Sequence, residues 1–220
     1  TVAELNAIAA KAGVVTATLA ANSASNVDVL TTSATDIITI SLNDAANASI
    51  AATVLSSIGG KTAGVVTVSN AIVITGNTAQ VTAALVTAAT LVVAADSKPD
   101  ITGNPTVAEL NAIAAKCDDV TATLAADTAA NIDGISTSAT DVITITLNDT
   151  AGNTVAATLL SSIGGKTAGV VTVSHAIIIS GTPAEVTAAL VTTDTLVVAT
   201  ASKPNISGNP TIAELNAIAA

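Results

Sequence analysis

The chain has 220 residues, of which 50% are hydrophobic, yet it contains no Phe, Tyr, Trp or Met. Sixteen acidic residues against six lysines and no arginine give a net charge of -10, so the cation clusters that nucleic acid or an anionic membrane surface would require are absent. Mean hydropathy is +0.70, but polar residues interrupt each apolar run before the roughly 18 residues of a membrane span, so no membrane insertion is predicted.

A tandem repeat organises the sequence. The segment TVAELNAIAA opens the chain at Thr1, recurs unchanged at Thr106 and recurs as TIAELNAIAA at Thr211, at intervals of 105 residues. We interpret the chain as a piece of a longer tandem array. The predicted parts are repeat 1 over residues 1–105, repeat 2 over residues 106–210 and the start of a third repeat over residues 211–220.

Helix-start signals recur with the repeat. In a capping box, a Thr or Asn side chain accepts a backbone N–H bond while the Glu or Gln three residues later reaches back to the cap. Behind the first such signal, Val2, Leu5 and Ile8 form an apolar stripe, which predicts a short helix ending near Lys11 and Gly13. The capping pairs are Thr1 with Glu4, Asn77 with Gln80, Thr106 with Glu109, Thr182 with Glu185, and Thr211 with Glu214.

Two further helices are predicted from apolar spacing. One begins after Asn43 and Asp44 and ends at the glycine pair Gly59–Gly60. The other follows Thr182. Their predicted inward residues are Ile50, Val54, Leu55 and Ile58 in the first and Val186, Ala189 and Leu190 in the second.

Short runs rich in β-branched residues predict strands between the helices. Alternation places Val15, Ala17 and Leu19 on a core face opposite Thr16 and Thr18. In the same way Ile38, Ile40 and Leu42 oppose Thr39 and Ser41. The predicted strands are VVTATLA from Val14, IITISL from Ile37, VVTVS from Val65, AIVITG from Ala71 and TLVVAA from Thr90.

The order of these elements predicts an α/β fold: a tandem repeat of short strand-helix units, solenoid-like with a largely parallel sheet. The alternative is a string of two-layer α/β beads. Two places favour hairpins and a mixed sheet instead, because strand-like runs meet across Ser69–Asn70 and across Ser97–Pro99.

The runs TVAELNAIAA, GVVTATLAANSASN, TSATDVITITLND and SGTPAEVTAAL together resemble the Ala/Thr/Val-rich tandem repeats of very large secreted or cell-surface proteins of bacteria, cyanobacteria especially. The resemblance implies a surface-exposed, adhesin-like or layer-forming role. It carries over no functional residue, and the GGxGxD pattern of calcium-binding repeats is absent from the sequence.

No catalytic, cofactor or metal site is predicted. The single histidine, His175, replaces Asn70 of repeat 1 and is interpreted as a turn residue. The single cysteine, Cys117, replaces Ala12 and lies beside Asp118 and Asp119, which would raise its pKa, so it is interpreted as a surface thiol and not a nucleophile.

The Gly-Gly-Lys-Thr runs at residues 59–62 and 164–167 have the ending of a phosphate-binding loop. However, Leu55 and Leu160 stand where that motif needs glycine, so helix C-caps are predicted. The serines have no histidine to act as a base.

Asp and Asn residues gather near strand ends, and calcium is possible but not favoured, because six to eight oxygens must surround one point. Asp96 and Asp100 become Ala201 and Asn205 in repeat 2. Asx caps and turns explain most of the others, which are Asn43 with Asp44 and Asn148 with Asp149.

Thr-x-Thr pairs on strands could match an ice lattice, although Thr is also a common solvent-facing strand residue. The pairs are Thr16 with Thr18, Thr121 with Thr123, and Thr144 with Thr146.

From these observations we predict a non-enzymatic structural segment of a long extracellular or cell-surface protein, acting as a spacer, filament or S-layer. Its expected partners are neighbouring repeats and other copies of itself. The alternative is an adhesin stalk that binds calcium or ice through repeated Thr and Asp positions.

Overall fold

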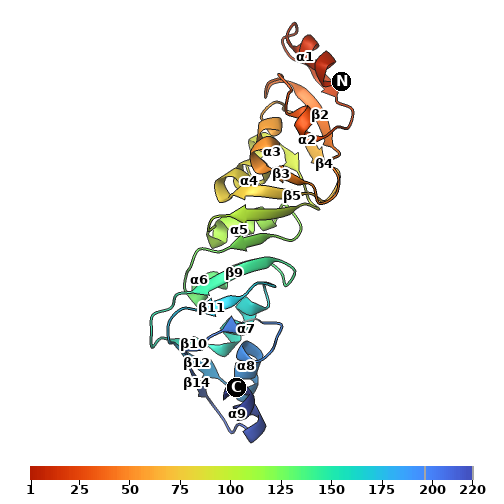
Figure 1. The fold of residues 1–220 in the computed structure, drawn as a ribbon. Coiled ribbons are helices and arrows are strands. Elements are labelled where there is room, and N and C mark those ends of the chain that lie inside the picture. The colour runs from red at the N-terminus through yellow and green to blue at the C-terminus, as the bar shows by residue number, and fades with distance from the viewer. Residues whose placement is uncertain (196, 220) are drawn as a thin grey trace. The chain divides into compact units, whose positions relative to one another are not determined.

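The computed structural model describes residues 1–195 and 197–219 and has an α/β fold with parallel sheets (Figure 1). The chain divides into two compact units. The first comprises Thr1–Gly103 with Ala112–Thr121, and the second comprises Asn104–Asn111 with Ala122–Ala220. Among the described residues, no helix is long and apolar enough to cross a membrane.

The elements of the first part of the chain alternate between strands and short helices. They are α1 Val2–Ala9, β1 Thr16–Thr18, α2 Ala24–Val27, β2 Ile37–Leu42, β3 Ser49–Ala51, α3 Ala52–Gly59, β4 Val66–Val68, β5 Val73–Asn77, α4 Thr78–Leu85, the 3₁₀ helix η1 Ala88–Thr90, β6 Val92–Val93 and β7 Lys98–Thr102. Next come α5 Val107–Ala114 and β8 Thr121–Thr123, whose residues are divided between the two units.

The elements of the second unit follow the same order. They are α6 Ala129–Ile132, β9 Val142–Leu147, β10 Thr154–Ala156, α7 Ala157–Gly164, β11 Val171–Val173, β12 Ile178–Gly181, α8 Pro183–Leu190, β13 Val197–Val198, β14 Lys203–Ile206 and α9 Ile212–Ala219.

Strands of the first unit pair in parallel in two separate sheets. One sheet has the order β1-β2-β4-β6, and β5 pairs on one side with β3 and on the other with β7. In the first sheet Ile40, Val66 and Val92 stand opposite one another at intervals of 26 residues. The chain therefore visits the first sheet, the second sheet and a helix in turn before it returns to the first sheet.

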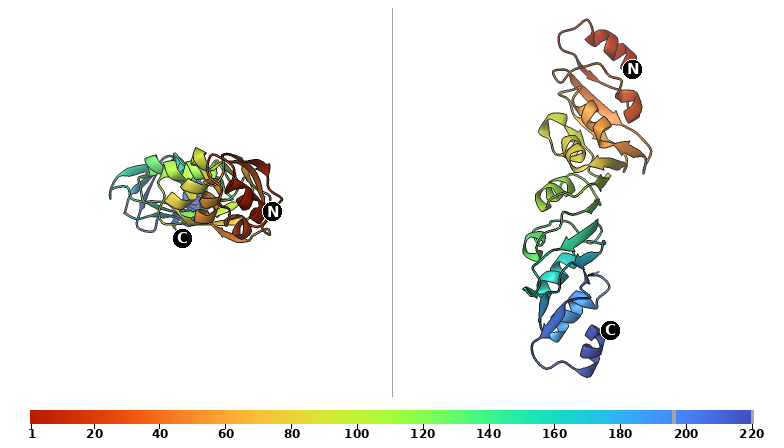
Figure 2. Two further views of the ribbon diagram at one scale, coloured as in Figure 1. Left: turned by 90° about the horizontal axis from the view of Figure 1, so that it is seen from above. Right: turned by 60° about the vertical axis from the view of Figure 1, so that its left-hand side comes forward.

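The second unit repeats this arrangement. β9, β11 and β13 pair in parallel, with Ile145, Val171 and Val197 opposite one another, again 26 residues apart. β10, β12 and β14 form the other parallel sheet. Helix α3 packs against α4 in the first unit, and α7 packs against α8 in the second (Figure 2).

The core forms where the apolar faces of the strands meet the helices. Ile38, Ile40 and Leu42 are 0 to 1% exposed, whereas Thr39 is exposed. The alternation predicted for β1 and β2 is confirmed, with Val15 and Leu19 buried and Thr16 and Thr18 exposed. Helix residues that complete the core include Leu55, Ile58, Val81 and Ala84 in the first unit and Leu160, Ile163, Val186 and Ala189 in the second.

Close approach of the backbone explains one glycine in each unit. A Cβ added to Gly64 would lie 2.3 Å from the carbonyl oxygen of Ile38, and one added to Gly169 would lie 2.3 Å from that of Ile143. Only a residue without a Cβ fits there.

Two sequence predictions are wrong in detail. The predicted hairpins do not form, because β4 and β5 lie in different sheets and every pairing of β4, β5 and β7 is parallel. The helix expected after Asn43 begins only at Ala52, because Asn47 takes a left-handed conformation (φ 61°) and Ile50 pairs with Ile74 as part of β3.

Candidate functional site

The residues with catalytic potential do not come together. Among the described residues, no group of three or more His, Cys, Asp or Glu side chains could hold a metal ion. His175 is exposed in the bend before β12, where its Nδ1 lies 3.1 Å from the Ser174 hydroxyl. The half-buried Cys117 thiol donates to the Ile113 carbonyl oxygen at 3.1 Å, just beyond α5.

The Gly-Gly-Lys-Thr runs end helices, as predicted. Gly60 is the C-cap of α3 and Gly165 the C-cap of α7. The lysine and threonine that follow are not part of any phosphate cradle. Instead they belong to two hydrogen-bonded groups that recur in both units.

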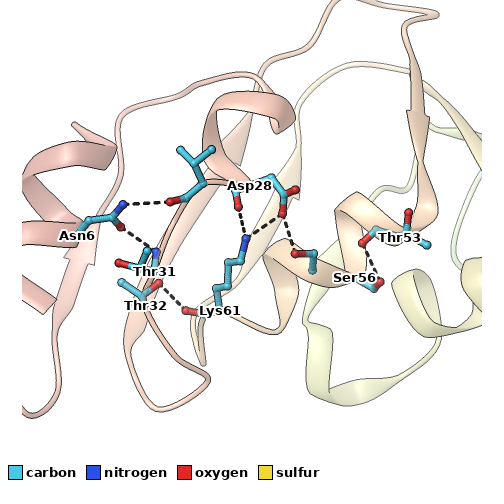
Figure 3. Close-up of polar contacts among 9 residues, drawn as sticks. Asn6, Asp28, Thr31, Thr32, Thr53, Ser56 and Lys61 are labelled. Atoms are coloured by element: carbon cyan, nitrogen blue, oxygen red, sulfur yellow. Dashed lines mark hydrogen bonds and ion pairs between the residues drawn. The ribbon is translucent and has the colours of Figure 1, made fainter. Parts of the chain in front are cut away.

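The first group, here called the lysine clamp, comprises Lys61, Asp28, Ser57 and Thr32 (Figure 3). Lys61 Nζ donates to Asp28 Oδ1 at 2.9 Å and also to the Asp28 carbonyl oxygen. The Ser57 hydroxyl donates to the same Oδ1 at 2.7 Å, and the Thr32 hydroxyl donates to the Lys61 carbonyl oxygen at 2.8 Å. The clamp thus fastens the end of α2 to the end of α3.

The second unit contains the same clamp. Lys166 Nζ donates to Asp133 Oδ1 at 2.9 Å and to the Asp133 carbonyl oxygen, Ser162 donates to Asp133 at 2.8 Å, and Thr137 donates to the Lys166 carbonyl oxygen at 2.8 Å. The lysine ammonium holds the pKa of Asp133 below its usual range, as Lys61 does for Asp28. Because both pairs are partly exposed, each ion pair contributes less than about 1 kcal/mol.

The second group, here called the buried latch, comprises Asp36 and Thr62. It links the segments at the starts of β1, β2 and β4, which are neighbours in the first sheet. Thr62, only 1% exposed, accepts the N–H groups of Ile38 at 2.7 Å and Gly64 at 2.8 Å, and its hydroxyl lies 2.8 Å from the Ile38 carbonyl oxygen. Asp36, 6% exposed, accepts from Val15 N–H at 2.7 Å. Asp36 also accepts from the N–H and the hydroxyl of Ser33, so the bonds of the latch hold neighbouring segments of the chain together.

In the second unit Thr167 occupies the position of Thr62 in this latch. Thr167 accepts the N–H groups of Ile143 and Gly169, both at 2.8 Å, and its hydroxyl lies 2.8 Å from the Ile143 carbonyl oxygen. Asp141 accepts from Ser138 N–H at 2.7 Å.

Acid is expected to weaken the fold through these carboxylates. The Ser33 and Val15 backbone N–H groups hold the pKa of Asp36 below its usual range near 4. A carboxyl whose pKa is lower in the folded chain binds its proton first in the unfolded chain, so its contribution to stability is full above its ordinary pKa near 4 and is lost as the pH falls through the lower folded-state pKa. Urea titrations at a series of pH values should show the free energy of unfolding falling in acid. The slope of that free energy against pH should be shallower in Asp36→Asn than in the wild-type chain. Equal slopes in the two proteins would contradict a contribution of Asp36 to the loss of stability in acid.

An asparagine in the TVAELNAIAA helix bridges to the following turn. Asn6 Nδ2 donates to the Val29 carbonyl oxygen at 3.0 Å, and its Oδ1 accepts Thr31 N–H at 2.9 Å (Figure 3). Asn111 makes the equivalent pair of bonds to Gly134 and Ser136, both at 2.8 Å.

Replacing this asparagine should cost stability only where the bridge exists. Asn111→Ala removes two hydrogen bonds and is expected to lower the free energy of unfolding by about 1 to 2 kcal/mol. The matched control is Asn216→Ala in the third copy of the same helix, where the side chain is exposed and no change is expected. Urea unfolding monitored by circular dichroism measures both. Equal losses would show that the bridge contributes nothing.

The Asp and Asn residues considered for calcium are placed singly. Asp44 accepts Ala24 N–H at 2.8 Å and Asp149 accepts Ala129 N–H at 2.9 Å, so each caps the start of a short helix. Asp96 and Asp100 are exposed. Asn43 is exposed beside Asp44, and Asn148 bonds the Ala126 carbonyl oxygen at 3.4 Å.

The threonine pairs lie on exposed strand faces but form a short ladder. Thr18 stands opposite Thr39, whereas Thr16 stands opposite Ile37. The row then continues through Val65, 45% exposed, and Leu91, 39% exposed. Of the other threonines, Thr121, Thr123 and Thr144 are exposed and Thr146 is half-buried. The result is a row of mixed Thr and aliphatic residues, and Lys116 lines a surface pocket together with Val65 and Leu91.

Sequence reasoning missed the clamp, the latch and the asparagine bridge. Their signal was present, because Asn6, Asp28, Lys61 and Thr62 all recur 105 residues later.

Neither a protein-family model, nor a curated protein sequence, nor a solved structure matches the chain significantly.

Proposed function

We propose that the chain is a non-enzymatic structural segment of a long extracellular or cell-surface protein, in which 105-residue repeats stack as an α/β solenoid. The observation that carries the proposal is the recurrence of one set of hydrogen bonds at that spacing. In both units a lysine Nζ lies 2.9 Å from an aspartate Oδ1, in the pairs Lys61–Asp28 and Lys166–Asp133. A serine hydroxyl donates to the same carboxylate at 2.7 Å in the first unit and at 2.8 Å in the second. Two segments with the same internal contacts can occupy equivalent places in a one-dimensional array.

The chemistry of the polar groups supports a structural role. Asp36 and Thr62 are buried and bonded to backbone groups, and Asp28 is bonded to a lysine and a serine. Such groups position the chain and leave no activated nucleophile or acid–base pair. The proposed partners are therefore neighbouring repeats and other copies of the chain.

A series of recombinant arrays with two, three and four repeats tests this proposal. If repeats stack, each added repeat contributes four rungs to the first sheet, β1, β2, β4 and β6, and lengthens the particle by about 19 Å at the usual strand spacing. Small-angle scattering measures the increment. A particle whose maximum dimension grows irregularly, or with the square root of repeat number, would contradict stacking and favour flexibly linked beads.

A second candidate, an adhesin stalk that binds ice, is favoured by the row of exposed Thr and aliphatic residues on the first sheet. In a chain of net charge -10, such a face presents hydroxyl and methyl groups at regular strand spacing. Thermal hysteresis in the wild-type chain, lost in Thr18→Asp with Thr39→Asp, would support it. The absence of thermal hysteresis at millimolar protein concentration would contradict ice binding.

A further inference from the structure

The sequence contains one Asp-Gly pair, Asp133–Gly134, and it lies in the lysine clamp of the second unit. In such a pair the glycine nitrogen can attack the side-chain carboxyl carbon of the aspartate, because glycine has no Cβ to crowd the five-membered ring that forms. The first unit has the same clamp around Asp28, but Val29 follows it, and a branched side chain hinders ring closure. The two clamps therefore surround peptide bonds of different chemical stability.

Isomerisation of this pair takes two balanced steps. The Gly134 nitrogen forms a bond to Asp133 Cγ and loses its proton, while the carboxyl hydroxyl leaves as water, which gives a succinimide. Water then adds to the ring and opens it at either carbonyl. Opening at the former main-chain carbonyl gives isoaspartate, in which the main chain runs through Cβ and Cγ and is longer by a single carbon. Water is the only co-reactant, and the mass of the chain does not change.

The clamp holds the Asp133 carboxyl group in a form and a direction that oppose this reaction. Lys166 Nζ donates to Asp133 Oδ1 at 2.9 Å, and the Ser162 hydroxyl donates to the carboxylate at 2.8 Å. These bonds favour the carboxylate over the neutral acid, which is the form that can lose its hydroxyl as water. Lys166 Nζ also donates to the Asp133 carbonyl oxygen, so one ammonium holds the carboxylate toward that oxygen and away from the Gly134 nitrogen. Figure 3 shows the equivalent arrangement, in which Lys61 binds both groups of Asp28.

The peptide group between Asp133 and Gly134 is held as well. Gly134 N–H donates to the Asn131 carbonyl oxygen at 3.2 Å, and the Gly134 carbonyl oxygen accepts from Asn111 Nδ2 at 2.8 Å. Asp133, the C-cap of α6, donates its N–H to the Ala129 carbonyl oxygen at 3.0 Å. The glycine nitrogen must therefore give up a hydrogen bond before it can react.

Burial does not protect this pair. The Asp133 side chain is 38% exposed, and Gly134 is exposed as well. Water can therefore reach the bond, and the hydrogen bonds of the clamp are what restrain the reacting groups.

We propose that Asp133–Gly134 is a latent isomerisation site, which the lysine clamp keeps unreacted while it fastens the end of α6 to the end of α7. Once isoaspartate forms, the carboxylate and the carbonyl oxygen of residue 133 no longer have the spacing that Lys166 binds, so the clamp cannot close again. The inference goes beyond the proposed structural role and does not depend on the stacking of repeats.

Ageing of the full 220-residue chain in neutral buffer tests the proposal. Peptide mapping with electron-transfer fragmentation distinguishes isoaspartate from aspartate and measures the conversion at residue 133. Lys166→Ala should raise the rate of conversion about 5-fold, the factor expected for the loss of a partly exposed ion pair. Lys166→Ala together with Ser162→Ala should raise it further. Equal rates in the wild-type chain and in this double variant would overturn the proposal.

The first unit supplies the matched control for the role of glycine. Lys61→Ala opens the equivalent clamp at Asp28 and Val29, where no isoaspartate should form. Gly134→Val in the Lys166→Ala chain should abolish the conversion at residue 133, and valine is accommodated at the equivalent position of the first unit. Conversion that continues at the same rate in that variant would contradict attack by the glycine nitrogen.

A final control separates opening of the clamp from general unfolding of the second unit. Ile179→Val weakens the core at a fully buried residue of β12 and leaves the clamp intact, so the rate at residue 133 should stay at the wild-type value. A rate raised as much as in Lys166→Ala would overturn the proposal, because conversion would then follow unfolding. Circular dichroism establishes that each variant is folded, and Ser162→Ala alone replaces Lys166→Ala if the latter is not.

Discussion

Gly64→Ala is expected to lower the free energy of unfolding by about 3 kcal/mol or more. The new Cβ would lie 2.3 Å from the Ile38 carbonyl oxygen and 2.5 Å from its carbonyl carbon, and backbone atoms cannot rotate out of the way as a side chain can. The clash can be relieved only if the backbone segment at Gly64 moves away from the segment at Ile38. That separation would also stretch the bonds from Thr62 to Ile38 and Gly64. Urea unfolding followed by circular dichroism measures the loss.

The chain offers matched controls for this substitution. Gly13→Ala places a Cβ with no atom within 4 Å, so it should leave stability unchanged or raise it by about 0.5 kcal/mol by restricting the unfolded chain. Gly169→Ala repeats the clash in the second unit, 2.3 Å from the Ile143 carbonyl oxygen, and should cost as much as Gly64→Ala. If neither Gly64→Ala nor Gly169→Ala lowered the free energy of unfolding appreciably, the backbone segments would not be held as closely as the structure shows.

Ile113→Ala is expected to cost about 3 kcal/mol, because it removes a fully buried side chain and leaves a cavity. Ile8→Ala, the same change within the same decapeptide, should cost less than about 0.5 kcal/mol because Ile8 is 55% exposed. Helix propensity and local sequence are equal in the two variants, so the difference measures tertiary burial alone.

Chemical denaturation should be done at a protein concentration where the chain is monomeric. Equal costs in dilute monomer would contradict the different burial of the two helices.

Local signals predicted much of the fold. The capping boxes at Thr1, Asn77 and Thr182 form as expected, because cap and partner are three residues apart. The strand Ile37–Leu42 has the predicted bounds and faces. The start of α3 was misplaced because Asn43 and Asp44 resemble a cap, whereas the pairing of Ile50 with Ile74 decides that this stretch is a strand. Sequence spacing carries no information about such a partner.

The polar contacts within each unit were beyond sequence reasoning for the same reason. Lys61 bonds to Asp28, which is 33 residues away, and Thr62 bonds to Ile38, which is 24 residues away. Nothing local to these residues indicates their partner. Recurrence of each residue 105 positions later was the available signal, but it shows only that two positions share an environment.

The sequence by itself determined where the helices with a capping box start and which residues of β1 and β2 face inward, because capping and alternation depend on residues within a few positions of one another. Only the tertiary structure decided the two-sheet path of the chain and the burial of the TVAELNAIAA helix. Leu110 and Ile113 are fully buried, whereas the equivalent residues of the other copies, Leu215 and Ile8, are 43% and 55% exposed. Burial depends on what lies against a side chain, and that neighbour is supplied by distant turns of the chain.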